Sequence, residues 1–102
     1  MDPIVGKCKL MLKAHYKERF GGLVCYGSTV RNNACPGSDI DLLVLLSPPF
    51  DYFRELRAIA DILYPAQLES DRLISAKPAA SDDYEEGTIQ LYRNARKEGI
   101  AV

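Results

Sequence analysis

The sequence predicts a mixed α+β (α/β) domain, and three observations lead to that class. Helical and strand-like segments alternate in the order helix, strand, short helix, strand, helix, strand, helix. Residues 42–46 are all apolar without alternation, which is typical of a strand in the middle of a sheet covered on both faces. At 102 residues the chain is long enough for one domain, residues 1–102, and too short for two. Periodicity alone leaves a two-layer and a three-layer arrangement open.

The first half of the chain is expected to contain one long helix and two strands. Apolar residues recur at helical spacing between lysines over residues 4–19, and the glycine pair at 21–22 is expected to end this helix. A short apolar strand is expected at residues 23–26, and a second strand at residues 39–46. Between them, residues 29–37 are expected to form a short helix or turn followed by a loop.

The second half is expected to contain a helix, a strand and a last helix. Asp51 is expected to cap a helix that runs to about residue 64, and Pro65 is expected to follow its end. The apolar residues expected on the inner face of this helix are Phe53, Leu56, Ile59, Ala60 and Leu63. A third strand is expected over residues 72–78, and a C-terminal helix over about residues 82–98.

The composition limits the location and the partners of the chain. Hydrophobic residues make up 47% and charged residues 26%, which is ordinary for a soluble globular protein. The net charge of −1 indicates no general attraction to nucleic acid or membrane, so such a partner would need a local patch. No apolar stretch approaches the roughly 20 residues that span a bilayer, and the N-terminus has no signal-peptide hydrophobic block. The three cysteines have no paired metal spacing and are expected to be reduced thiols, so a cytoplasmic location is expected.

Two short motifs stand at the ends of the first two predicted strands. Gly27-Ser28 closes the first strand, and Asp39-Ile40-Asp41 opens the second after ten intervening residues. Residues two apart on a strand share a face, with Cα atoms about 7 Å apart, so Asp39 and Asp41 can share one hard divalent cation or hold two. A glycine lets the backbone approach a phosphate, and a serine adds a hydroxyl donor. The structural alternatives are an ordinary turn aspartate for Asp39 and a plain strand-ending turn for the Gly-Ser pair.

This arrangement resembles the active-site motif of the polymerase-beta-like nucleotidyltransferase superfamily, above all its smallest branch, the minimal nucleotidyltransferases. Their signature is Gly-Ser, about ten residues and Asp-x-Asp. The resemblance implies a small mixed sheet with the Asp-x-Asp strand central and helices packed against it, with a motif core at about residues 20–80. It implies Mg²⁺ held by Asp39 and Asp41, with ATP as the substrate. It also implies that Gly27 and Ser28 bind the triphosphate, and Arg31 is a further candidate for the same phosphates.

The chain departs from the family pattern at the third carboxylate. The family usually adds an acid on the next strand, which acts as metal ligand and as base for the attacking hydroxyl. In this sequence Ser75 stands near that place, while Glu69 and Asp71 come just before the predicted strand. Asp71 is the candidate third metal ligand if the strand begins earlier, and Glu69 is a weaker one. The departure leaves open whether the chain transfers nucleotides or only binds them.

Two functions of different class follow, and a third is disfavoured. The resemblance implies transfer of AMP to a hydroxyl of a partner protein, a helical HEPN-domain RNase toxin for which the chain acts as antitoxin. The alternative is a catalytically weak nucleotide- and metal-binding module that acts by binding a partner protein. Transfer to a small molecule such as an antibiotic is disfavoured, because 102 residues leave no room for an acceptor domain. The nucleotide, the acceptor and any self-association stay open.

Overall fold

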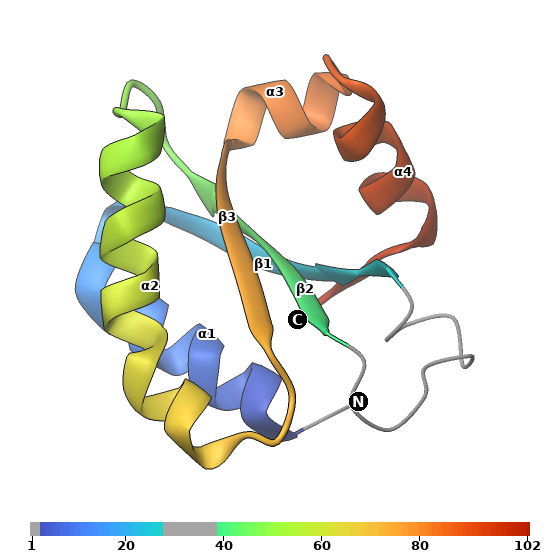
Figure 1. The fold of residues 1–102 in the computed structure, drawn as a ribbon. Helices are drawn as coiled ribbons and strands as arrows, with labels where there is room; N and C mark the ends of the chain where they lie inside the picture. Colours follow the sequence, from blue (N-terminus) through green and yellow to red (C-terminus); the bar gives the residue numbers. More distant parts are fainter. Residues whose placement is uncertain (1–2, 28–38) are drawn as a thin grey trace.

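The structure, a computed structural model, describes residues 3–27 and 39–102. Figure 1 shows the order of the helices and strands along the chain. They are α1 (Pro3–Tyr16), the 3₁₀ turn η1 (Lys17–Arg19), β1 (Phe20–Tyr26), β2 (Ile40–Leu46), α2 (Tyr52–Glu69), β3 (Ile74–Ala80), α3 (Ser81–Glu86), α4 (Gln90–Glu98) and β4 (Ile100–Ala101). Within the described ranges, no helix has both the length and the apolar character needed to cross a bilayer.

The four strands form one mixed sheet in the order β3-β2-β1-β4. β1 runs antiparallel to both β2 and β4, whereas β2 and β3 are parallel and are joined by α2. β2 therefore lies inside the sheet, between β1 and β3 (Figure 1). The predicted fold class, a small mixed sheet with the Asp-x-Asp strand central and helices packed against it, is confirmed.

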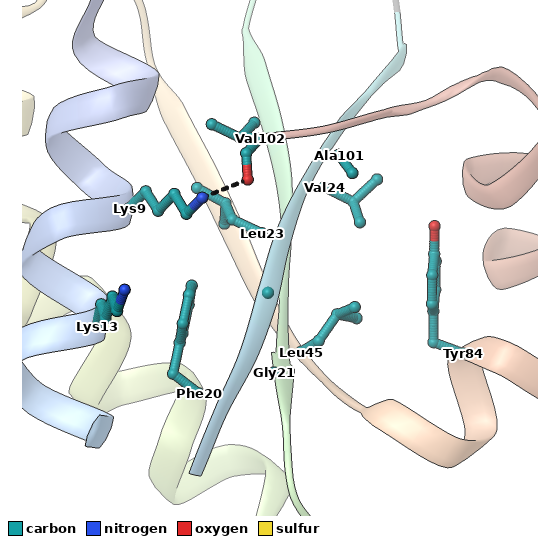
Figure 2. A pocket seen from close by; sticks show the side chains of 11 residues that line it. Lys9, Lys13, Phe20, Gly21, Leu23, Val24, Leu45, Tyr84, Ala101 and Val102 are labelled. Atoms are coloured by element: carbon teal, nitrogen blue, oxygen red, sulfur yellow. Dashed lines mark hydrogen bonds between the residues drawn. The ribbon is translucent and has the colours of Figure 1, made fainter. Parts of the chain in front are cut away.

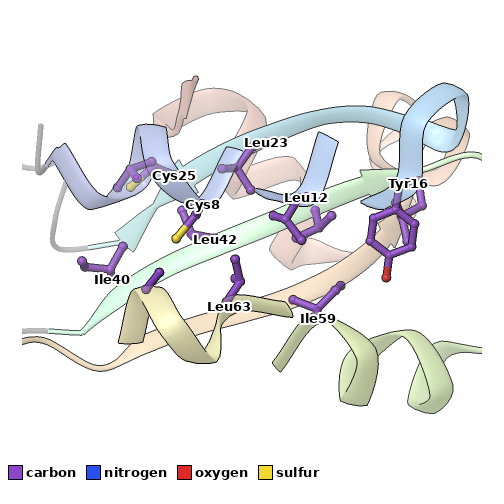
Figure 3. Packing of buried hydrophobic residues seen from close by; sticks show 13 residues of the cluster. Cys8, Leu12, Tyr16, Leu23, Cys25, Ile40, Leu42, Ile59 and Leu63 are labelled. Carbon is purple, nitrogen blue, oxygen red and sulfur yellow. The ribbon is translucent and has the colours of Figure 1, made fainter. Parts of the chain in front are cut away.

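Helices cover both faces of the sheet, α1 and α2 on one side and α3 and α4 on the other (Figure 1). The larger core lies under α1 and α2, where Leu12 and Leu63 pack against Leu42 and its neighbours (Figure 3). The smaller core includes Leu43 from β2 and Ala95 from α4. Since alternate residues of β2 enter different cores, the strand is apolar from Leu42 to Leu46. The side chain at position 41 shares the face of Leu43, the face that α3 and α4 cover.

The first glycine pair does not end the first helix, contrary to the sequence prediction. α1 ends at Tyr16, and Lys17, with φ of 54°, turns the chain into β1. Gly21 and Gly22 lie inside β1, where the register with β2 shifts between Phe20 and Gly22. A Cβ on Gly21 would lie 2.5 Å from Ser81 Oγ. These glycines therefore permit a bulge and a close approach instead of stopping a helix.

The second helix continues past Pro65, which was predicted to follow its end. α2 runs to Glu69 with Pro65 inside it. The amide of Gln67 bonds the carbonyl of Arg72 at 2.9 Å and the N–H of Ile74 at 2.7 Å, which ties the last turn of α2 to β3. The predicted inner face is wrong at two positions, because Phe53 is 73% exposed and Ala60 is also exposed. The buried residues of α2 are Ile59, Leu63 and Ala66.

The predicted C-terminal helix over about residues 82–98 is two helices. α3 ends at Gly87, whose φ of 68° is left-handed and whose N–H bonds the carbonyls of Asp83 and Tyr84. Arg93 of α4 donates a hydrogen bond to the Gly87 carbonyl at 2.7 Å, so hydrogen bonds to both helices stabilise the turn at Gly87. The third strand also begins two residues later than predicted, at Ile74, and β4 was not predicted at all.

Candidate functional site

Asp41 is the second residue of the central strand and lies between two neighbours across the sheet. It pairs with Tyr26, the last residue of β1, and with Ser75 of β3. Its side chain is partly buried, whereas Asp39 lies just before the strand and is exposed. The N–H of Ile40 between them donates to the carbonyl of Leu73 at 2.8 Å, which fixes the start of β2 against β3. The two carboxylates therefore stand at one end of the sheet, where β1 ends and β2 begins.

Gly27 lies directly against the carboxylate of Asp41. Its φ of +81° lies in the region that favours glycine. A Cβ at this position would lie 2.6 Å from Asp41 Oδ2 and 3.5 Å from Asp41 Cγ. Any side chain at position 27 would thus displace the carboxylate or the backbone. Both the conformation and the contact require glycine here.

The site concentrates negative charge in a partly desolvated place. Burial raises the pKa of Asp41, the charge of Asp39 raises it further, and the charge of Lys77 lowers it. Burial, followed by the charge of Asp41 and by Tyr52, raises the pKa of Tyr26 to about 12. Asp39 and Asp41 therefore repel each other when both are ionised. A cation placed between them would relieve this repulsion, and carboxylate oxygens are the ligands that hard divalent cations prefer.

The positions of β3 beside Asp41 carry a hydroxyl and an amine. Ser75 pairs with Asp41, and Lys77 pairs with Leu43, so both face the side of Asp41. Residues 28–38 contain neither aspartate nor glutamate. In the parts of the chain that the structure describes, no three His, Cys, Asp or Glu side chains are grouped as a metal site. The residues fit one cation at Asp39 and Asp41, and β3 offers no carboxylate for a second.

The other predicted site residues lie elsewhere or outside the described ranges. Asp71 lies between α2 and β3, where it lines a hollow of about 360 Å³ with Ile4 and Glu69. Its role as third metal ligand stays a prediction. Ser28 and Arg31, predicted to bind the triphosphate, lie outside the described residues.

Two residues of the site, Tyr26 and Lys77, were not singled out from the sequence. Tyr26 was seen only as the end of an apolar run, although a polar aromatic beside a Gly-Ser pair is a usable signal. Lys77 lies in the third strand, which is at the edge of the sheet, and a lysine is ordinary on an edge strand, so the residue type alone did not indicate a site. Which face Lys77 occupies depends on the register of β3 against β2, and that register is visible only in the structure.

A second cavity lies away from the carboxylates, along the first part of β1 (Figure 2). Its volume is about 420 Å³, and its lining includes Lys9, Lys13, Phe20, Leu23, Leu45 and Tyr84. Lys9 Nζ donates to the carbonyl of Val102 at 2.7 Å across it. Asp41 pairs with Tyr26 at the opposite end of β1, so this cavity is separate from the carboxylate site.

Gly27 against the carboxylate of Asp41, with Asp39 just before the central strand, offers the oxygen ligands that hard divalent cations prefer, beside a backbone that a phosphate can approach. The family model of the nucleotidyltransferase domain matches residues 7–93 of the chain. The chain belongs to this family, and its general function is nucleotidyl transfer. Domains of the family generally use a nucleoside triphosphate and a divalent metal. No curated protein matches the chain.

Proposed function

We propose that the chain transfers AMP from ATP to a hydroxyl group of a partner protein. The partner is a HEPN-domain toxin, and the chain is its antitoxin. The observation that carries the proposal is the close approach of Gly27 to the Asp41 carboxylate of the central strand, with Asp39 just before that strand. This contact supports a place where a triphosphate can approach the backbone while the acids hold its cation. The resemblance to minimal nucleotidyltransferases supports the choice of nucleotide and partner.

In the proposed reaction, the acceptor oxygen bonds to the α-phosphorus of ATP as the bond to the bridging oxygen breaks. Pyrophosphate leaves with the electron pair of that broken bond, and the proton of the acceptor hydroxyl passes to water. Asp39 and Asp41 would hold Mg²⁺, which supplies positive charge to the triphosphate and to the leaving pyrophosphate. Gly27 leaves room for phosphate oxygens near its backbone, since no side chain projects there. The partial burial of Asp41 strengthens its attraction to a cation relative to a site in open water.

A partner protein as the source of the acceptor hydroxyl has support from the described surface. Side chains of α1 and α2 pack on one face of the sheet, and side chains of α3 and α4 pack on the other. Near the C-terminal end of α2, Tyr64, Leu68 and Leu73 are 60%, 69% and 58% exposed. Tyr64 and Leu68 lie four residues apart on α2 and therefore share a face, and exposed large side chains on one face favour contact with another protein.

The direct test mixes the purified chain with Mg²⁺, ATP labelled at the α-phosphate and a HEPN-domain partner. We expect label on the partner, and a loss of at least about 100-fold in labelling with Asp39→Asn or Asp41→Asn, because each removes a metal ligand. Asp61→Asn is the matched control, since Asp61 is an exposed acid on α2 outside the site. Equal labelling by all variants contradicts the assignment of the carboxylates.

The second candidate function is the catalytically weak binding module, and one observation favours it. The residue that pairs with Asp41 on β3 is Ser75, a hydroxyl where a carboxylate base would stand in the family. On this alternative the chain binds nucleotide and holds its partner by contact. A tight complex that carries no label, and that Asp41→Asn leaves intact, supports the module over the transferase.

A further inference from the structure

The face of β3 that borders Asp41 carries a lysine. Lys77 stands two residues after Ser75, on the same side of the sheet, and pairs with Leu43. Strands lie about 4.8 Å apart and rise about 3.3 Å per residue, so Asp41 and Lys77 are separated by roughly 8 Å along the backbone diagonal, a distance that a lysine side chain spans. The positive charge of Lys77 acts on the carboxyl group of Asp41 in the folded chain. The ammonium group therefore belongs to the surroundings of the carboxylate site.

Lys77 is half-buried, so part of its side chain lies along the protein surface. Among the described residues it makes neither a hydrogen bond nor an ion pair within 4 Å. An ammonium group on this side of the site attracts anions, and a bound triphosphate carries several negative charges.

The same lysine disfavours a second metal ion at this place. A second cation would need an oxygen ligand from β3, and the position beside Asp41 offers only the Ser75 hydroxyl. It would also meet the charge of Lys77 in a partly buried setting, where like charges repel more strongly than in water. The β3 side of the site is thus suited to an anion held by a lysine.

We propose that Lys77 is a nucleotide-binding residue whose ammonium group contacts the triphosphate, so that the site uses one divalent cation and one lysine in place of two cations. The proposal rests on the proposed nucleotide site at Asp39 and Asp41. It specifies how that site recognises its ligand, and it holds for the transferase and for the binding module alike.

The first test is calorimetric titration with ATP, in Mg²⁺ and in EDTA. Lys77→Ala should weaken Mg²⁺·ATP binding by about 10- to 100-fold, the range of one hydrogen bond to a charged group. Lys77→Arg should keep most of the affinity, because the charge remains. In EDTA the wild type should retain weak binding that Lys77→Ala abolishes. Lys97→Ala, an exposed lysine on α4, is the control and should bind as the wild type does. Thermal unfolding of each variant checks that it is folded.

The second test counts Mn²⁺ bound per chain in the presence of ATP, by the loss of the free-Mn²⁺ signal in electron paramagnetic resonance. We expect one ion for the wild type and two for the Ser75→Asp/Lys77→Ala double variant, which gives β3 a carboxylate and removes the competing charge. Two ions on the wild type, or equal ATP affinity for wild type and Lys77→Ala, overturns the role of Lys77. If Asp41→Asn still weakens ATP binding in that case, the proposed site stands without Lys77. Absence of ATP binding by the wild type overturns both.

Discussion

Replacement of Gly27 by alanine tests the contact on which the site is built. The alanine would have to adopt φ of +81°, and its Cβ would lie 2.6 Å from Asp41 Oδ2. The left-handed conformation costs an L-residue about 1–2 kcal/mol. For a domain of this size, each kcal/mol corresponds to about 4–8 °C in Tm, so we expect Tm to fall by roughly 5–15 °C. Because the carboxylate must also turn away, Mg²⁺·ATP affinity should fall at least about tenfold.

The assays are thermal unfolding and calorimetric titration with Mg²⁺·ATP, and the chain supplies its own control. Gly6 lies on α1, and a Cβ there meets nothing within 4 Å. Gly6→Ala should therefore raise the free energy of unfolding by about 0.5–1 kcal/mol and leave ATP binding unchanged. In an Asp41→Ala background the cost of Gly27→Ala should shrink, since the colliding oxygen is gone. If Gly27→Ala keeps the Tm and the ATP affinity of the wild type, position 27 needs neither the left-handed conformation nor the open space beside Asp41.

Three further outcomes are expected. Burial and the charge of Asp39 raise the folded-state pKa of Asp41, so ionisation of Asp41 destabilises the folded chain. The free energy of unfolding therefore falls as pH rises from about 3.9, the unfolded-state pKa, through the folded-state pKa. In EDTA, Asp41→Asn should thus be more stable than wild type at pH 7 and equal to it near pH 3 by urea titration; a less stable variant at pH 7 contradicts the sign. Leu63 is 3% exposed, so Leu63→Ala should lower the free energy of unfolding by about 2–5 kcal/mol in urea titration. Phe53 is 73% exposed, so Phe53→Ala should lower it by less than about 0.5 kcal/mol. Similar losses for the two variants would contradict the orientation of α2, in which Leu63 faces the core and Phe53 faces solvent. Gly87→Ala, at φ of 68°, should cost about 1–2 kcal/mol, and an unchanged urea midpoint would argue against the left-handed turn between α3 and α4.

Local signals with one physical meaning were read correctly from the sequence. The consecutive apolar residues of β2 can all be buried only if both faces of the strand are covered, and β2 is a central strand of the sheet. Asp51 caps α2, with its carboxylate accepting the N–H of Arg54 at 3.1 Å. Each of these features depends on residues close together in the chain.

Residue types that have two possible structural roles were interpreted wrongly, because tertiary contacts determine which role applies. Glycine ends helices and also permits close packing, and at Gly21 the neighbouring Ser81 shows that packing applies. Proline usually ends a helix, but Gln67 holds the turn beyond Pro65. At Gly87 the error is the opposite one, because the helix was predicted to continue through this glycine and the glycine ends it.

The candidate site was predictable in part for the same reason. The spacing of the motifs indicated that Gly27 and Asp41 belong together, and the structure places them in contact distance. The face that each residue of the third strand occupies depends on the register of that strand against β2, and a shift of one residue exchanges the two faces. The register of β3 puts Ser75 beside Asp41 and Lys77 on the same face, whereas Asp71 lies before the strand.

The most direct measurement is a crystal structure of the chain with Mn²⁺ and a non-hydrolysable ATP analogue, with the anomalous signal locating the metal. We expect one Mn²⁺ between the carboxylates of Asp39 and Asp41, with the triphosphate lying against Gly27. Mn²⁺ bound elsewhere, or a triphosphate away from the Gly27 backbone, would show that these residues do not form the nucleotide site.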